Sequence, residues 1–314
     1  MNVSVPVVTY NSSKTIIETL ESILHQSYNS KNIELIISDD ASRDDTVKVI
    51  EKWLLVNSVH FFKVVFIKNI TNRGVSRNCN NAWKASNCEW IKIIAGDDTL
   101  NPDCIKENIT YIRKNPDCKI LFSKMEWFGN IKKITPSPYN LKFFKKDHKR
   151  QTKWLQYFSF NIAPTSFINR NALIDVGYAN ENYRDIEDLP LWIEFTLAGY
   201  KLHFLDCVTV NYRVGSSITM STSRLVNFNF LNNLISINEK YTSSFWTSPI
   251  YELIRLEHLF LLESYIFIGK TFNNKKNFFT AMARYIPWFF IPLHVLHYLW
   301  SGLYNSVAKV SKKT

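Results

Sequence analysis

Three pairs of neighbouring acidic residues have the clearest potential for chemistry in this sequence. They are Asp39 and Asp40, Asp97 and Asp98, and Glu187 and Asp188. Adjacent carboxylates repel each other, so a bound cation or hydrogen-bond donors must offset the repulsion. Each pair also has an ordinary alternative, because Asp is common in turns and at the N-termini of helices. Two pairs at one edge of the same sheet would favour a binding site over that alternative.

Two of these pairs suit different tasks. Asp97 and Asp98 offer the oxygen ligands that Mg²⁺ or Mn²⁺ prefers, with substrate phosphates completing the coordination shell. Asp40 could instead accept an N–H group of a nucleobase while Tyr10 supplies an aromatic face. The segment NRGVSRN adds two arginines that could reach a diphosphate, because Arg binds phosphate through a planar set of N–H groups, and these are Arg73 and Arg77.

The first hundred residues alternate between strand-like and helix-like patterns. Short apolar or β-branched runs predict strands, and apolar residues at helical spacing predict helices between them. In chain order, we expect strands at 3–9, 33–38, 61–67 and 90–95, with helices at 16–24, 47–54 and 76–85. This alternation predicts an α/β fold with a mainly parallel central sheet and flanking helices.

Ligands of such sheets bind beyond the carboxyl ends of the strands. Polar residues follow the first, second and fourth predicted strands. We therefore expect three loops to converge there, formed by Thr9, Tyr10 and Asn11, by Asp39 to Ser42, and by Gly96 to Asp98.

Composition excludes several classes of protein. The chain is 46% hydrophobic and 15% aromatic, so it can bury enough apolar surface to fold and is not disordered. Its eight glycines are never closer together than 16 residues, which excludes a G-x-G-x-x-G turn and a Walker A loop. The five cysteines form no C-x-x-C pair and fit free thiols in a reducing cytosol. The N-terminus lacks the basic lead-in of a signal peptide, so we expect it to be structural.

The net charge of +11 allows for nucleic acid, anionic lipid or a phosphorylated substrate as the partner. No nucleic-acid-binding signature accompanies the basic residues, so nucleic acid is the least favoured of the three. The stretch KFFKKDHKRQTK at 142–153 is either a solvated face or mobile loop, or an acceptor-side loop that meets a lipid diphosphate or an anionic membrane surface.

The motifs together resemble the family-2 glycosyltransferases with the GT-A fold. The matching stretches are VSVPVVTYN, IELIISDDAS, NRGVSRNCNNAW, EWIKIIAGDDTLNPDCI, YRDIEDLPLWIEFTLAGYKLHFLD and NYRVGSS, which span about residues 2–217 in the family's order. The resemblance implies that Thr9, Tyr10 and Asp40 hold the nucleotide base, with Asn11 and Asp39 beside them. It implies that Asp97 and Asp98 hold the metal and the diphosphate, Asp98 being the more direct metal ligand.

The same resemblance implies a catalytic base at Glu187 and Asp188, with Asp188 deprotonating the acceptor hydroxyl. The alternative is that Asp188 caps the helix that follows, since Pro190 and Gly199 punctuate that helix in the ordinary way. Trp192 on this helix is a further candidate contact for the acceptor. Many relatives carry a His after the late Tyr-Arg pair, whereas this chain continues from Arg213 with Val-Gly-Ser. Either the metal is held more loosely here, or Arg213 meets the phosphates instead.

We expect three regions along the chain. Residues 1–100 would form the nucleotide-sugar-binding half of a GT-A domain, 101–220 the acceptor-binding half with the catalytic base, and 221–314 a helical, aromatic-rich region. In that last region, 285–308 contains no Asp, Glu, Lys or Arg. Its prolines, histidines and aromatic residues favour helices lying in a membrane interface, while a membrane span and a core or dimer helix are the alternatives.

The resemblance thus predicts an inverting, metal-dependent glycosyltransferase, cytoplasmic and peripheral on the inner face of the membrane. It would move a sugar from a nucleoside diphosphate, most favourably UDP, to a saccharide or a polyprenyl-diphosphate-linked saccharide in surface polysaccharide synthesis. The competing hypothesis is a non-catalytic GT-A module that binds nucleotide sugars or acts as a membrane scaffold.

Overall fold

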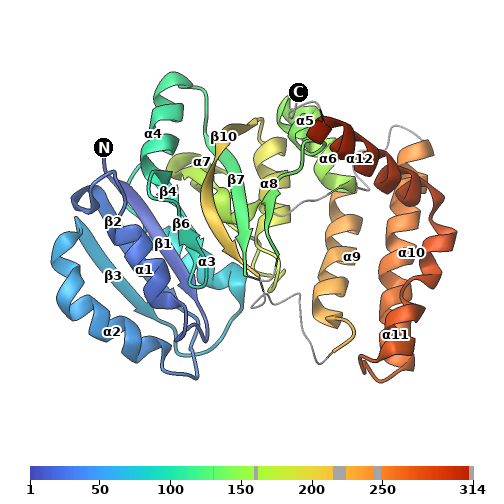
Figure 1. Ribbon diagram of the computed structural model, residues 1–314, viewed down its shortest axis with the longest axis horizontal. Helices are drawn as coiled ribbons and strands as arrows, with labels where there is room; N and C mark the ends of the chain where they lie inside the picture. The colour runs from blue at the N-terminus through green and yellow to red at the C-terminus, as the bar shows by residue number, and fades with distance from the viewer. Residues whose placement is uncertain (130, 159–161, 215–223, 243–248, 311–314) are drawn as a thin grey trace. The chain divides into compact units, whose positions relative to one another are not determined.

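The computed structural model describes residues 1–129, 131–158, 162–214, 224–242 and 249–310. A mixed sheet with flanking helices is followed by C-terminal helices (Figure 1). By its internal contacts the chain divides into two compact units. The first comprises Met1–Pro136, Lys146–Gln151 and Phe160–Ser216, and the second comprises Ser137–Lys145, Thr152–Ser159 and Ser217–Thr314.

One sheet contains the strands of the described residues. They are β1 (Val3–Thr9), β2 (Ile33–Asp39), β3 (Lys63–Lys68), β4 (Trp90–Lys92), β5 (Ile94–Ala95), β6 (Thr99–Leu100), β7 (Ile120–Phe128), β8 (Lys133–Thr135), β9 (Phe167–Asn169) and β10 (Leu202–Arg213). The order is β3-β2-β1-β4-β9-β7-β10-β6, with β5 beside β1 and β8 beside β7.

The first half of the sheet is parallel throughout. β3, β2, β1 and β4 run the same way, β9 is antiparallel to β4 and β7, and β10 is parallel to β7. The short strand β6 pairs antiparallel with β10. The predicted α/β fold with a mainly parallel sheet is therefore confirmed.

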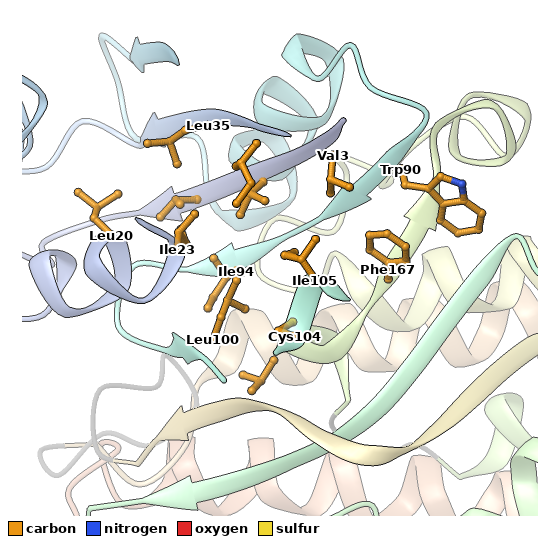
Figure 2. Packing of buried hydrophobic residues seen from close by; sticks show 14 of the residues in the cluster. Val3, Leu20, Ile23, Leu35, Trp90, Ile94, Leu100, Cys104, Ile105 and Phe167 are labelled. Carbon is orange, nitrogen blue, oxygen red and sulfur yellow. The ribbon is translucent and has the colours of Figure 1, made fainter. Parts of the chain in front are cut away.

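All seven residues of β1 and of β2 are buried, as expected for central strands covered on both faces. Alternate residues of β1, beginning with Val3, join one hydrophobic cluster with Leu20 and Ile23 of α1 (Ile16–Leu24). Figure 2 shows Leu20 and Ile23 beside β1 and β2, with Ile94 and Leu100 nearby. This core fixes the strands whose carboxyl ends carry the candidate site.

Three further predicted helices are present in the first unit, with small changes in their ends. They are α2 (Thr46–Asn57), α3 (Val75–Ala85) and α8 (Asp188–Leu197), and the unit also contains α4 (Cys104–Lys114), α7 (Arg170–Asp175) and the 3-10 turns η1 (Ser30–Asn32), η2 (Ser58–His60) and η3 (Ala163–Thr165). α3 packs against β1 and β2.

Two strand predictions need correction. The third strand begins only at Lys63, because Phe61 and Phe62 belong to the turn before it. The run from Trp90 to Ala95 is not one strand: it is divided at Ile93 into β4 and β5.

The second unit is helical. It contains α5 (Leu141–Phe144), α9 (Phe228–Thr242), α10 (Pro249–Thr271), α11 (Phe278–Ala283), the 3-10 turn η4 (Ile286–Phe290) and α12 (Pro292–Val310), while α6 (His148–Tyr157) crosses the division between the units. The basic stretch 142–153 is thus helical, and the prediction of a loop there is wrong. Phe143 and Phe144 in its first turn are buried, which explains why the backbone is ordered around them.

Residues 285–308 do not form one continuous helix, because η4 and Ile291 interrupt them before α12 begins. Among the described residues, no helix combines the length and the apolar character needed to cross a bilayer. The five cysteines are free thiols, as predicted.

Candidate functional site

Three loops meet at the carboxyl edge of the sheet, as the sequence predicts. The backbone N–H of Asp40 donates to the carbonyl of Thr9 over 2.9 Å, and the N–H of Gly96 donates to the carbonyl of Val8 over 2.9 Å. The N–H of Asn11 donates to Ser42 Oγ over 2.8 Å. The loops after β1, β2 and β5 are thus joined by direct hydrogen bonds.

Close packing requires a glycine where the first and third loops meet. A Cβ atom at Gly96 would lie 2.8 Å from Thr9 Oγ1, and 2.9 Å from Thr9 Cβ. The Thr9 hydroxyl itself is buried and has no hydrogen-bond partner among the described residues. The edge therefore holds a polar atom that the protein alone does not satisfy, which is typical of a binding site.

The second loop is folded by its own carboxylates. Asp39 accepts the N–H of Ser42 over 2.8 Å, and it also accepts the Ser42 hydroxyl. Asp40 accepts the N–H groups of Arg73 and Gly74 over 3.0 and 2.9 Å. Ala41 between them has φ = 60°, a left-handed conformation that costs about 1–2 kcal/mol for a residue with a Cβ. Asp40 thus ties the second loop to the start of α3.

A groove of about 780 Å³ opens beside this loop. It is lined by Tyr10, Asp39, Ala41, Ser42, Arg43, Val47, Lys68, Asn69, Ile70, Thr71, Asn72 and Arg184. Tyr10 and Asp39 were predicted to bind the nucleotide, and the structure brings them together here. Arg43, Lys68 and Arg184 were missed as lining residues. Only Arg184 had a signal in the sequence, because it lies in the quoted stretch YRDIEDLP.

The loop of Asp97 and Asp98 is positioned by α1 and β10. Thr15 Oγ1 and Thr19 Oγ1, one helical turn apart, donate to the carbonyls of Gly96 and Asp98 over 2.9 and 2.7 Å. Arg213 donates its backbone N–H to Asp98 Oδ1 over 2.8 Å.

The Arg213 side chain lies along the same loop. Its Nε donates to the carbonyl of Asp97 over 2.8 Å, its Nη2 pairs with Glu18, and its guanidinium lies 4.5 Å from the centre of the Phe128 ring. The structure therefore brings Arg213 to the acidic pair, where it was expected to act. Gly215 and Ser216, the next positions of that motif, lie outside the described residues.

The Asp98 carboxyl group is 1% exposed. Burial and the neighbouring charge of Asp97 raise its pKa to about 8, although the N–H of Arg213 and the charge of Lys92 act in the opposite direction. A carboxylate held against such a penalty gains most from a cation.

The residues present fit a divalent cation of the kind held by one or two carboxylates and a substrate phosphate. Asp97 is partly exposed and Asp98 lies next to it. Among the described residues no cluster of three or more His, Cys, Asp or Glu side chains forms a complete metal cage. The metal would therefore depend on phosphate oxygens for the rest of its shell.

Polar residues of α3 hold the segment that leads to α8. Ser76 donates its N–H to the carbonyl of Arg184 over 3.3 Å and its hydroxyl to the carbonyl of Tyr183. Asn80 exchanges hydrogen bonds with the backbone of Ala179, at 2.9 and 3.0 Å. At Gly74, where φ is 91°, a Cβ atom would lie 2.7 Å from the carbonyl oxygen of Arg184. The NRGVSRNCNNAW motif thus orients the residues that precede Glu187 and Asp188.

Glu187 and Asp188 lie at the start of α8, and each keeps only a small accessible surface. Burial and the charge of Asp188 raise the pKa of Glu187 to about 8. Burial also raises the pKa of Asp188, whose Oδ1 accepts the N–H of Leu189 over 2.7 Å. Glu187 occupies the N-cap position and makes no capping hydrogen bond through its side chain, whereas Asp188, the first residue of α8, accepts an N–H of the first turn.

Cys79 of α3 connects the two acidic clusters. Its thiol is buried, and burial together with the charges of Glu187, Asp188 and Asp40 raises its pKa well above the ordinary value. All three carboxylates thus act on one thiol of α3, although Asp40 and Asp188 are 148 positions apart in the sequence.

Two predicted contacts are occupied within the protein. Arg77 forms an ion pair with Glu181 at 3.6 Å, so it braces the segment before α8. Trp192 is 4% exposed and packs edge-on against Phe122, with ring centres 4.9 Å apart. Arg73 is exposed, and its Nε donates to Thr71 Oγ1 over 3.1 Å.

Comparison with known proteins gives a consistent result. The sequence matches the family model Glycosyl transferase family 2 over residues 4–177. A protein of Escherichia coli, named UDP-Glc:alpha-D-GlcNAc-diphosphoundecaprenol beta-1,3-glucosyltransferase WfaP, is 29% identical over 217 residues, which cover 68% of this chain and 77% of that protein.

Solved structures share the fold at lower identity. TarS residues 1–349 from S. aureus in complex with UDP superpose with a TM-score of 0.60 at 20% identity, covering 87% of this chain and 74% of that one. Mannosyltransferase PcManGT from Pyrobaculum calidifontis, in complex with GDP-Man and Mn²⁺, gives a TM-score of 0.59 at 15% identity, covering 98% and 86%. In a longer TarS structure the chain spans 43% of the length.

Proposed function

This chain belongs to glycosyl transferase family 2, a nucleotide-sugar glycosyltransferase family with members in bacterial polysaccharide synthesis, and from that premise we propose its reaction. It is an inverting enzyme that moves a sugar from a nucleoside diphosphate to a saccharide or polyprenyl-diphosphate-linked saccharide in O-antigen or capsule synthesis. The observation that carries the proposal is the link that the start of α3 makes between the two acidic clusters. Asp40 accepts the N–H of Gly74 over 2.9 Å, and Ser76 donates to the carbonyls of Tyr183 and Arg184, just before Glu187 and Asp188.

UDP is the proposed carrier, and residues 1–100 supply most of its contacts. The groove beside Tyr10 and Asp39 offers an exposed aromatic ring and polar groups for a base and ribose. The name of the E. coli relative includes UDP-Glc, and TarS was solved with UDP. The GDP-Man complex of PcManGT makes GDP the carrier to test against it.

Asp97 and Asp98 are the residues that would hold Mn²⁺ or Mg²⁺. A divalent cation there supplies positive charge beside the diphosphate as that group leaves. Arg213, which already lies along this loop, orients both aspartates through its N–H and Nε groups. Arg73 and Arg77 are exposed at the start of α3 and add positive charge on the donor side.

Asp188 is the proposed base. Its carboxylate accepts the proton of the acceptor hydroxyl as the oxygen attacks the anomeric carbon from the face opposite the diphosphate, which inverts that centre. Burial raises the pKa of Asp188, and a carboxylate with a raised pKa takes up a proton more readily than an ordinary one. Glu187 lies next to this base, and burial together with the charge of Asp188 raises the pKa of Glu187 to about 8.

The acceptor would bind to residues 101–220, on the side of α8. A polyprenyl-linked acceptor places the reaction at the cytoplasmic face of the membrane, and the diphosphoundecaprenol in the name of the E. coli relative supports this choice. The helical region 221–314 would keep the enzyme there.

The test is calorimetric titration of UDP, GDP, CDP and dTDP, each with and without Mn²⁺, on the wild type and on Asp98→Ala. We expect one nucleotide to bind in a metal-dependent way and to lose that dependence in the variant. Asp117→Ala, a change at an exposed carboxylate in the turn before β7, is the matched control and should bind like the wild type. If no nucleotide binds under any condition, the donor site is wrong and a scaffold function takes its place.

A further inference from the structure

The second unit carries an apolar surface that the proposed reaction does not use. Large side chains of η4 and α12 face outward, and we call this set the apolar strip: Phe289 (86% exposed), Phe290 (65%), Leu296 (60%), Trp300 (62%), Leu303 (64%) and Val307 (68%). Isolated exposed apolar residues are ordinary, but a run of this density is not.

In a helix on a water-facing surface the exposed face is polar, whereas in α12 the exposed face is apolar. Leu296, Trp300, Leu303 and Val307 follow one another at spacings of four, three and four, so they share one face. The other side of the helix makes the protein contacts. The ring of His297 stacks on Phe158 at 4.0 Å, Tyr304 lies edge-on to Tyr139 at 5.9 Å, and Asn305 Oδ1 accepts the N–H of Tyr139 over 2.9 Å.

Hydrogen bonds to α10 hold η4 and the start of α12 in place, and so fix the position of the strip. Glu257 of α10 accepts the N–H groups of Leu293 and His294 over 3.0 and 2.9 Å, which caps the start of α12. Trp288 Nε1 donates to the hydroxyl of Tyr265 over 3.0 Å, and Pro287 is buried. Because their neighbours are anchored on α10, Phe289 and Phe290 remain outside.

The segment of sequence that carries the strip has charged residues of one sign only. Residues 264–314 contain no Asp or Glu and seven basic residues, Lys270, Lys275, Lys276, Arg284, Lys309, Lys312 and Lys313. Lys275 and Lys276 are exposed just before α11, and the capping box of Asn277 and Thr280 fixes the first turn of that helix, where Phe278 and Phe279 are exposed by 74% and 78%.

We propose that the apolar strip of η4 and α12 docks on the surface of an anionic lipid bilayer, with Lys275 and Lys276 on the headgroups. Aromatic and aliphatic side chains with a basic surround suit the headgroup boundary, where both the apolar burial and the charge attraction contribute. A second copy of the chain is less suitable, because its strip would bring a surface of the same positive charge. The inference extends the proposed place of action at the membrane, and it does not depend on the transfer reaction.

Vesicle flotation with the full chain tests the proposal. The probes are vesicles of phosphatidylcholine alone and of phosphatidylcholine with phosphatidylglycerol. We expect the wild type to float with the anionic vesicles. The double variant Phe289→Ser with Trp300→Ser should have a partition coefficient at least about tenfold lower. The matched control is Leu55→Ser with Val56→Ser on α2, which removes side chains 83% and 70% exposed in the first unit and should float like the wild type.

A second variant keeps the test decisive if the first does not fold. Lys275→Glu with Lys276→Glu changes two exposed residues and should weaken flotation with the anionic vesicles several-fold, because each basic residue near the surface contributes about 1 kcal/mol. Added salt should reduce the flotation of the wild type and narrow the difference between it and this variant.

Three results would overturn the proposal. The wild type could stay unbound, the strip variant could float as well as the wild type, or light scattering could show a dimer that becomes monomeric in the strip variant without any lipid binding. Calorimetry with the nucleotide on the same variants separates this outcome from a failure of the proposed function, since donor binding should remain unchanged in both.

Discussion

The two ends of the central sheet each bury carboxylates and treat them in opposite ways. Near the amino ends of the strands, Glu34 of β2 is 0% exposed and accepts Ser4 Oγ over 2.6 Å and two N–H groups of Asn87 over 2.8 Å each. Lys63 on β3 lies 3.2 Å from it. Burial alone would raise the pKa of Glu34, but the hydrogen bonds from Ser4 and Asn87 outweigh it and hold the pKa below its ordinary value.

At the carboxyl ends, Asp98 and Glu187 have fewer hydrogen-bond donors beside them than Glu34 has. Burial raises the pKa of Asp98 and of Glu187 to about 8, and neighbouring acidic groups add to both shifts. The difference separates carboxylates that stabilise the fold from carboxylates that remain available to bind a ligand. Carboxylates that the protein satisfies hold the fold together, whereas those it leaves short of donors are suited to a cation or a proton.

The largest expected effect is on turnover, at the carboxyl end. Asp188→Asn removes the proposed proton acceptor, so we expect kcat to fall by about 10²- to 10⁴-fold while donor affinity is retained. Asp185→Asn, three positions earlier in the same segment, is the control and should keep most of the activity. Steady-state kinetics and calorimetry on both variants would decide; an Asp188→Asn enzyme with normal turnover removes this residue from the role of base.

The next effect is on stability, at the amino end. Glu34→Ala leaves the buried hydroxyl of Ser4 and two N–H groups of Asn87 without their acceptor, and we expect a loss of about 1–3 kcal/mol in the free energy of unfolding. Glu51→Ala breaks a half-exposed ion pair with Lys68 and should cost no more than about 1 kcal/mol. Chemical denaturation at pH 7 measures both, and equal losses would contradict the contrast between the two ends.

A smaller effect of opposite sign is expected at Glu187. Between pH 4.5 and 8 the unfolded chain releases this proton while the folded protein retains it, so the folded state loses stability as pH rises through that window. Glu187→Gln removes that loss and should stabilise the fold by about 1–2 kcal/mol at pH 8. At pH 4 the gain should vanish, because Glu187 is then protonated in the folded state and largely protonated in the unfolded chain. Thermal melts across this range test the sign, and a gain that persists at pH 4 would point to another cause.

The smallest effect concerns the backbone at the carboxyl edge. Ala41→Gly relieves a left-handed conformation, and this relief outweighs the greater flexibility of glycine in the unfolded chain, so we expect a gain of no more than about 1 kcal/mol. Ala82→Gly in the middle of α3 is the control and should lose about 1 kcal/mol. Melting temperatures of both variants measure the difference. A loss at position 41 as large as that at position 82 would show that the strain is not released.

The sequence was most informative where local pattern determines structure. The buried runs of β1 and β2 and the amphipathic face of α1 were predictable, because apolar periodicity reflects burial directly. The convergence of Asp40 with Gly96 followed from strand direction alone. The interruption at Ile93 was not predictable, because it depends on pairing with β1 and β9 and not on local propensity.

Parts of the site could not have been found from spacing. Arg43 and Lys68 line the groove only because β2, β3 and α2 are adjacent in space. The partner of Arg77 could not be read from its own motif either, since Glu181 lies on a segment that α3 brings back to it. The direction of a side chain on a predicted helix is also hard to infer from sequence. Trp192 was placed on a helix, but the pattern did not reveal that it faces Phe122 in the core.

The contact between Arg213 and Asp98 has a consequence for how the protein is made. The two residues lie 115 positions apart, so the loop of the acidic pair leaves the ribosome long before β10 exists to support it. A nascent chain that ends in the first hundred residues already contains β1, β2 and β3, but it lacks the N–H group that Asp98 accepts and the proposed base Asp188. The candidate site is therefore completed only after Arg213 has been synthesised, and translation products that end before it carry an unfinished site.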